Sequence, residues 1–276
     1  MSSNQIALLG AIAGITIFIG LPVGRVRTAM PRTRVMLNAV ATGILIFLVW
    51  DVLTHAWEPV DVALSGHDYR TATGYGAVFA AAFAAGIMSL VYFDRWMARK
   101  ARRTLPVGPG AAVATELAGA PANIDRARNL AMMIAIGIGL HNFGEGLAIG
   151  NSAASGELAL ATLLVVGFAL HNATEGFGIV APLTAEGIRP SWGRLALLGL
   201  IGGGPTFLGT IVGEQFVSDV MSIAFLSLAA GSILYVVIEL LAVGRRMGHK
   251  ELMTWGLVLG VLLGFATDAI VTAAGA

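Results

Sequence analysis

The chain has 276 residues, of which 57% are hydrophobic and 12% are charged, and its mean hydropathy is +0.81. Soluble domains carry about 25% charged residues, so this chain lacks the polar surface of a soluble fold and is predicted to be an integral membrane protein. Its net charge of +1 gives no basis for a nucleic-acid partner, and the absence of cysteine excludes disulfides and thiolate metal sites.

Eight apolar runs predict an all-α fold with eight transmembrane helices in a single domain over residues 1–276. A helix that crosses a hydrocarbon core of ~30 Å needs roughly 17–25 residues, and each run is about that long. The runs lie near 5–23, 34–55, 74–95, 128–150, 157–182, 193–213, 219–242 and 252–273. The connections are short, except for residues 96–127, whose Pro-, Gly- and Ala-rich part predicts a flexible cytoplasmic loop.

The basic residues predict how the helices are oriented. Sixteen of the seventeen Lys and Arg residues lie in alternate connections, and Arg70 lies alone in the others. By the positive-inside rule those sixteen are cytoplasmic, which places both termini outside, on the periplasmic or extracellular side of the cell (inner) membrane.

Two internal similarities organise the chain, and the weaker one relates the second run to the seventh. Residues 41–53 read ATGILIFLVWDVL and residues 229–241 read AAGSILYVVIELL, so that Asp51 and Glu239 each follow a glycine by eight positions. The second run leaves the cytoplasm and the seventh enters it. The pattern therefore predicts an inverted repeat that relates runs one to three with runs six to eight.

The stronger similarity is a polar motif in the fourth and fifth runs, HNFGEGLAIG at 141–150 and HNATEGFGIV at 171–180. On a helix, a histidine and a glutamate four residues apart share one face, and the asparagine lies close to the same stripe. If the two helices pack antiparallel at similar depth, six donor residues converge. They are His141, Asn142, Glu145, His171, Asn172 and Glu175.

The chemistry of these residues indicates a metal site. A carboxylate inside a membrane costs ~2.5–3.5 kcal/mol, so Asp51, Glu145, Glu175 and Glu239 are expected to face a cavity or a partner. Lys and Arg lie only outside the runs or at their ends and do not pair with these acids, so a divalent cation is the simplest partner. A single histidine would suggest only an interhelical hydrogen bond, but structural polar pairs have no need to recur at fixed spacing. Imidazole with carboxylate and amide oxygen suits Zn²⁺, Fe²⁺, Mn²⁺ or Co²⁺, and leaves the choice among them open.

The paired motifs resemble the fourth and fifth transmembrane helices of the ZIP (Zrt/Irt-like protein) family of divalent metal transporters, prokaryotic type. The eight spans, the long connection between spans three and four, and the acids in spans two and seven fit the same resemblance. It implies import of zinc, or of iron or manganese, with cobalt or cadmium as further cargo. It also implies a 3+2+3 arrangement of helices and a homodimer, with the metal as substrate and no separate cofactor.

Four positions depart from the family's pattern. Gly144 and Thr174 stand where the family usually has proline, which predicts softer kinks. Asn172 stands where some members have aspartate, and Gly204 precedes Pro205 where many have a glutamate that bridges a second metal. With only two carboxylates left in the motifs, we expect one tightly held metal per chain.

The functional hypothesis is a transporter rather than an enzyme. Metal would enter from outside near Asp51 and Glu239, bind between spans four and five, and leave towards the cytoplasm. One alternative is an intramembrane metalloprotease, but that chemistry requires H-E-x-x-H, which the chain lacks. Another is a structural or sensory membrane protein that a metal stabilises.

Overall fold

The computed structural model describes residues 1–25, 31–104, 124–185, 187–246 and 249–273, and within these ranges all regular structure is helical. Eight segments are long and apolar enough to cross a membrane, as predicted. The elements are α1 (Ser3–Ile15), α2 (Ile17–Gly20), η1 (Leu21–Arg25), α3 (Pro31–Ser65), α4 (Tyr69–Thr104), α6 (Ile124–Ser155), α7 (Leu158–Ala185), α8 (Trp192–Gly213), α9 (Asp219–Arg246) and α10 (Lys250–Ala273). The first span combines α1, α2 and η1.

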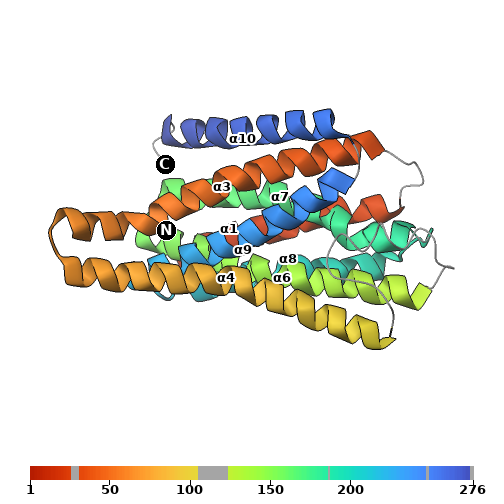
Figure 1. Cartoon of the computed structure of the whole chain (residues 1–276), viewed down its shortest axis with the longest axis horizontal. Helices are drawn as coiled ribbons and strands as arrows, with labels where there is room; N and C mark the ends of the chain where they lie inside the picture. Colours follow the sequence, from red (N-terminus) through yellow and green to blue (C-terminus); the bar gives the residue numbers. More distant parts are fainter. Residues whose placement is uncertain (26–30, 105–123, 186, 247–248, 274–276) are drawn as a thin grey trace.

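Several helices continue past the apolar runs that predicted them. The α3 helix runs on to Ser65 and α4 begins at Tyr69, so the two form a helical hairpin that projects from the bundle (Figure 1). Hydropathy marks where a helix meets lipid, and a helix need not end there. The predicted loop at 96–127 is likewise helical at both ends, up to Thr104 and from Ile124, and the rest of it lies outside the described residues.

The tip of the hairpin is a tight turn. His67 adopts a positive φ of 60°, a conformation that few residues other than glycine take. Asp68 then accepts hydrogen bonds from the backbone N–H of Thr71 at 3.1 Å and from its hydroxyl at 2.7 Å, which starts α4. The hydroxyl bond and the backbone bond hold the pKa of Asp68 below its usual value.

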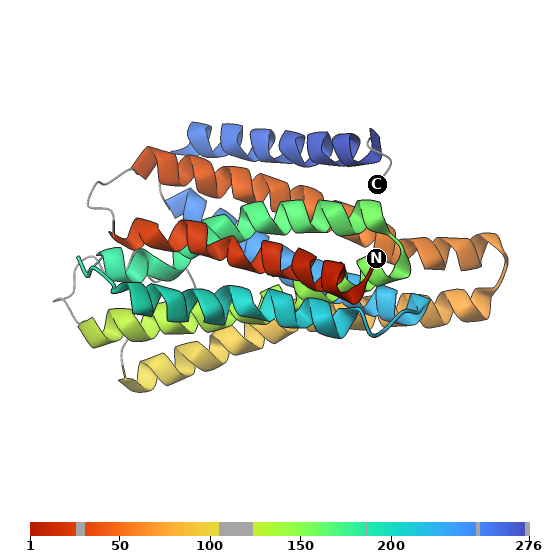
Figure 2. The same ribbon diagram turned by 180° about the vertical axis from the view of Figure 1, so that it is seen from behind.

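The helices pack as two groups of four. Figure 2 shows part of the first group from its open side, with the first span (red) between α7 (green) and α8 (teal). In one group α6 packs against α7 and α8, and the first span packs against the same two helices; in the other, α3 packs against α4, α9 and α10, and α4 packs against α9. Exchanging spans one, two and three with six, seven and eight, and α6 with α7, turns each pairing into one that the structure also contains; α3 with α4 becomes α9 with α10, which are in contact as well. This is the symmetry that the inverted repeat predicts, with α6 and α7 as the central pair of a 3+2+3 arrangement.

Glycines allow the helices within each group to approach backbone to backbone. A Cβ atom on Gly203 of α8 would lie 2.2 Å from the carbonyl oxygen of Gly14, and one on Gly260 of α10 would lie 2.1 Å from that of Val40. Neither contact could accept a side chain, since the obstacle is backbone in each case.

The helix ends that border the basic connections and the chain termini lie at opposite ends of the bundle. Figure 1 shows the C-terminal end of α4 and the N-terminal ends of α6 and α10 at one end, and the marks of both termini on the other side towards the hairpin. We refer to these as the basic end and the hairpin end.

Candidate metal site

The two motif copies meet in the middle of the bundle. The α6 and α7 helices are joined by a short turn at Gly156 (φ +90°), so they run antiparallel and bring their polar faces together. All six motif residues are buried, with exposed fractions between 0 and 7%. Polar groups this deep in an apolar bundle need partners, and those partners define what the site can do.

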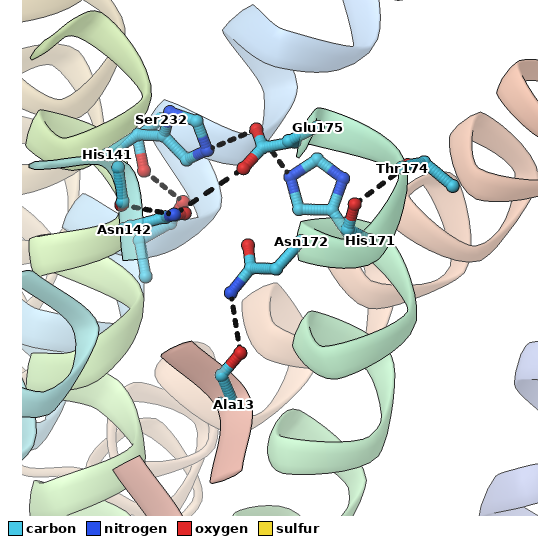
Figure 3. A network of polar contacts seen from close by, with 10 residues as sticks. Ala13, His141, Asn142, His171, Asn172, Thr174, Glu175 and Ser232 are labelled. Atoms are coloured by element: carbon cyan, nitrogen blue, oxygen red, sulfur yellow. Dashed lines mark hydrogen bonds and ion pairs between the residues drawn. The ribbon is translucent and has the colours of Figure 1, made fainter. Parts of the chain in front are cut away.

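Glu175 is the centre of the contacts that the protein makes with itself (Figure 3). Its Oε1 atom lies 2.8 Å from Nε2 of His141 and 3.0 Å from Nε2 of His171. Its Oε2 atom accepts a hydrogen bond from Nδ2 of Asn142 at 3.4 Å. One carboxylate therefore contacts both histidines and links the two helices.

Glu145 is in a different situation. It is fully buried, and neither carboxylate oxygen has a hydrogen-bond partner among the described residues. A ligand atom of Glu145 lies within 4.8 Å of ligand atoms of both His141 and His171. An unpaired carboxylate is very costly in such surroundings, so a cation bound between these three residues would relieve that cost.

The asparagines connect the site to the helices on either side. Asn142 donates from Nδ2 to the carbonyl of Gly202 on α8 at 2.9 Å, and Asn172 donates from Nδ2 to the carbonyl of Ala13 on α1 at 3.0 Å. In both residues the Oδ1 atom is buried and has no hydrogen-bond partner in the described structure. Each amide is thus held by its nitrogen, which leaves an oxygen available as a ligand.

The glycine that follows each glutamate serves close packing. A Cβ atom on Gly146 would lie 2.2 Å from the carbonyl oxygen of Thr206 on α8, and one on Gly176 would lie 2.4 Å from that of Ile17. The two motif helices therefore pack closely against α8 and the first span, which lets the asparagines reach those backbones.

These donors suit a transition metal. Two imidazoles, two carboxylates and two amide oxygens form a mixed nitrogen and oxygen set, whereas Ca²⁺ and Mg²⁺ favour oxygen alone. The partnerless oxygens of Glu145, Asn142 and Asn172 fit such an ion as substrate.

The structure corrects the expectation that Asp51 and Glu239 lie together on one side of the site. Leu48 of α3 contacts Gly167 of α7, which lies one turn from His171 towards the hairpin end. Asp51 follows Leu48 by almost one more turn in the same direction. Asp51 therefore lies about 10 Å from the site, measured along the helices towards the hairpin end. Ser232 lies beside Gly144, and Glu239 follows it by about two turns towards the basic end. The two acids therefore flank the site on opposite sides and cannot both be at the entrance. The inverted repeat itself implies this, because it reverses the direction of one helix relative to the other.

The backbone carbonyls of Gly202 and Ala13 are the contributors that sequence reasoning missed. A carbonyl oxygen is present at every residue, so no sequence pattern distinguishes these two. Gly204, by contrast, does not belong to the buried face of α8, and a Cβ atom there would meet nothing within 4 Å.

Comparison with known proteins shows the family to which the chain belongs. No curated protein matches the chain. A family model described as the ZIP zinc transporter matches residues 111–272, which is more than half of the chain and includes both motif copies. The chain therefore belongs to the ZIP family of zinc transporters and is a multi-pass membrane protein that transports divalent metal ions.

Proposed function

We propose that the protein imports a divalent transition metal, zinc above all, into the cytoplasm through a site formed by the six motif residues. The observation that carries this proposal is the buried carboxylate of Glu145, which has no hydrogen-bond partner in the described structure and lies within 4.8 Å of ligand atoms of both histidines. Iron, manganese, cobalt and cadmium remain further substrates, since the same donors suit them.

The proposed path follows the two flanking acids. Asp51, on the hairpin side of the site, would receive metal from outside, and Glu239, on the basic side, would receive it on the way to the cytoplasm. Histidine, amide and carboxylate ligands together bind a metal more weakly than a closed thiolate cage does. A transport site requires this weaker binding in order to release its ion.

We expect one ion at the centre. Glu145 and Glu175 together balance one divalent charge, and a second adjacent ion would leave about two uncompensated charges in a low-dielectric interior. Gly204 supplies no further carboxylate.

The direction of transport depends on the orientation of the bundle, which the chain makes easy to test because it has no cysteine. We expect the basic end to be cytoplasmic. Ser65→Cys in the hairpin should then react with an impermeant thiol reagent in intact cells, whereas Gly110→Cys should react only after lysis. The opposite labelling would reverse the direction that we propose.

Uptake of radioactive zinc into proteoliposomes tests the function directly. A transporter fills the vesicles, whereas a sensor or a metal-stabilised structural protein binds zinc without accumulating it. The metalloprotease alternative is excluded by membership of a transporter family.

We also propose a homodimer. Only 11% of the apolar segment of α4 that could cross the membrane is buried within the chain, so this helix has a large apolar surface available for lipid or for a second copy. Light scattering of the purified protein in detergent would measure the number of copies.

A further inference from the structure

Pro182 leaves one backbone carbonyl of α7 without its usual partner. It lies inside the helix, and proline has no N–H, so the carbonyl of Gly178, four positions earlier, loses the hydrogen bond that a helix normally gives it. His171, Glu175 and Gly178 follow one another at intervals of four and three residues and therefore share one face of α7. The freed carbonyl thus belongs to the face of the helix that carries the metal site.

Open space adjoins this carbonyl. A Cβ atom on Gly178 would meet nothing within 4 Å, and the residue is only half-buried, whereas His171 and Glu175 are buried. Gly178 follows Glu175 by three residues, which is ~4.5 Å along the helix towards the basic end. The space therefore begins less than one turn from the carboxylate that contacts both histidines, on the side where we propose that the metal leaves.

The other copy of the motif lacks both features. Its equivalent residue is Ala148, seven positions after His141, and this alanine is 0% exposed. Ser152 stands where α7 has Pro182, so α6 keeps its N–H at that position. Because α6 runs antiparallel to α7, Ala148 lies towards the hairpin end. Beyond the motif, the helix face is thus closed and regular on the hairpin side, and open with an interrupted helix on the basic side.

A free carbonyl in this place suits a cation in transit. Glu239, the acid that flanks the site on the basic side, lies about two turns beyond Ser232, so a gap separates it from the central ligands. An ion that crosses an apolar bundle needs oxygen atoms in place of its water. Interrupted helices in membrane transporters supply such carbonyls to cations. A single neutral oxygen holds an ion weakly, which allows the ion to move on.

We propose that the carbonyl of Gly178 is the first ligand that the metal meets when it leaves the central site towards the cytoplasm, and that Pro182 is a positioning residue that keeps this carbonyl free. This role rests on the proposed function, because an exit ligand matters only if the central site transports the metal. The oxygen lowers the barrier to leaving and adds nothing to the affinity of the centre. The maximal rate of uptake should therefore depend on it, whereas equilibrium binding should not.

Pro182→Ala tests the free carbonyl directly, because alanine restores the N–H that would occupy it. We expect the maximal rate of zinc uptake into proteoliposomes to fall about tenfold, while zinc binding to the purified full chain in detergent, measured by equilibrium dialysis, stays unchanged. The matched control is Pro205→Ala on α8. Pro205 frees the carbonyl of Ile201 in the same way, but that oxygen is packed against α6, 2.3 Å from the position of a Cβ on Gly139. Pro205→Ala should therefore leave uptake per folded molecule unchanged.

Gly178→Leu tests the open space. The leucine side chain would fill the space beside the carbonyl without a clash at its Cβ atom. We expect this variant to melt at the wild-type temperature, to bind zinc with unchanged affinity, and to take zinc up about tenfold more slowly. Gly74→Leu is the control, since a Cβ atom there also meets nothing within 4 Å and Gly74 lies on the exposed face of α4. It should not change uptake.

Three results would overturn the proposal. The first is wild-type uptake in either Pro182→Ala or Gly178→Leu. The second is an equal loss in Pro182→Ala and Pro205→Ala, which would attribute the effect to the bend of a helix. The third is a loss of zinc binding in step with uptake, which would place the effect at the central site. Failure of the proposed function has a different signature, because the wild-type chain itself would then bind zinc without accumulating it.

Discussion

The two copies of the motif share part of their contacts and differ in the rest. In each copy the asparagine donates to the backbone of a flanking helix, and the glycine packs against that same helix or its continuation. The glutamates differ: Glu175 contacts both histidines, whereas Glu145 has no hydrogen-bond partner in the described structure.

This difference separates what holds the site together from what receives the metal. Asparagine and glycine build the symmetric scaffold, in which α6 is fixed to α8 and α7 to the first span. Glu175 links the copies by bringing the histidine nitrogens to one point. Glu145 is the ligand that the protein's own contacts leave available, so the same residue in the two copies serves two purposes.

Neutralising each glutamate is the largest perturbation and tests this division. Glu145→Gln and Glu175→Gln should each lower zinc uptake about 100-fold, because each removes a ligand and a charge that balances the ion. Their stabilities should differ. Glu175→Gln should cost about 3 kcal/mol, because it breaks buried contacts to two histidines, whereas Glu145→Gln should be as stable as wild type or more so, because it removes a buried unpaired charge.

Uptake into proteoliposomes and thermal melting in detergent with a chelator measure the two effects separately. The exposed Glu157, at the turn between α6 and α7, provides a matched control as Glu157→Gln, which should change neither. Equal destabilisation by the two central variants would mean that Glu145 has protein contacts equivalent to those of Glu175.

The motif glycines come next, and here the two copies should behave alike. Alanine at Gly146 or Gly176 would place a Cβ atom against a carbonyl oxygen of the neighbouring helix, and backbone cannot move aside as a flexible side chain can. We expect each change to cost about 3 kcal/mol. Gly178→Ala is the control on the same helix as Gly176: its Cβ would meet nothing within 4 Å, so it should be neutral or stabilising by up to ~1 kcal/mol.

Melting of the purified variants measures these costs. A neutral Gly176→Ala beside a damaging Gly146→Ala would show that the first span yields where α8 does not, and that the scaffold is less symmetric than its contacts indicate.

How far the sequence predicts this molecule depends on what each signal records. Apolar length and the positions of the basic residues record contact with lipid, so they predict eight spans but not the extension of α3 to Ser65, which occurs where lipid no longer constrains the helix. The repeated motif predicts that two helices meet. It cannot predict that Glu175 rather than Glu145 contacts both histidines. Both copies have glutamate at this position, and only the residues that surround each one in the folded protein distinguish them.

The flanking acids illustrate the same limit. The similarity of residues 41–53 and 229–241 contains the information that Asp51 and Glu239 lie on opposite sides of the site, because an inverted repeat reverses depth. The expectation that both acids lie at the entrance rests on their charge alone, and a charge inside a span does not indicate how deep in the membrane the residue lies.

The asparagine contacts should give a smaller effect than either glutamates or glycines. Asn142→Asp and Asn172→Asp keep the side-chain shape but replace the donor with an acceptor that faces a carbonyl oxygen. Each should cost about 1–3 kcal/mol and reduce uptake about tenfold. Asn151→Asp is the control: it loses a donor to the carbonyl of Phe216 (2.6 Å) outside the motif, so its stability should fall while its rate per folded molecule stays unchanged. If the aspartate variants transported as well as wild type, the amide contacts would be dispensable for the site.

The smallest expected effect lies at the fourth position of the motif, where the copies carry Gly144 and Thr174. Thr174 donates its hydroxyl to the carbonyl of His171 at 2.7 Å, a local contact that Gly144 cannot make, and the helix continues in both cases. Hydroxyl bonds of this kind to a carbonyl of the preceding turn affect a helix only slightly. Thr174→Val should therefore change stability by less than about 0.5 kcal/mol and uptake by less than about twofold.

Thr174→Pro removes the hydroxyl and the backbone N–H together, which leaves the carbonyl of Leu170 without its helical donor and should cost about 3 kcal/mol. Uptake and melting of the two variants side by side would decide whether the hydroxyl or the backbone N–H maintains the second copy. A large loss with Thr174→Val would show that the geometry of His171 depends on the hydroxyl, and that the copies differ in scaffold as well as in their glutamates.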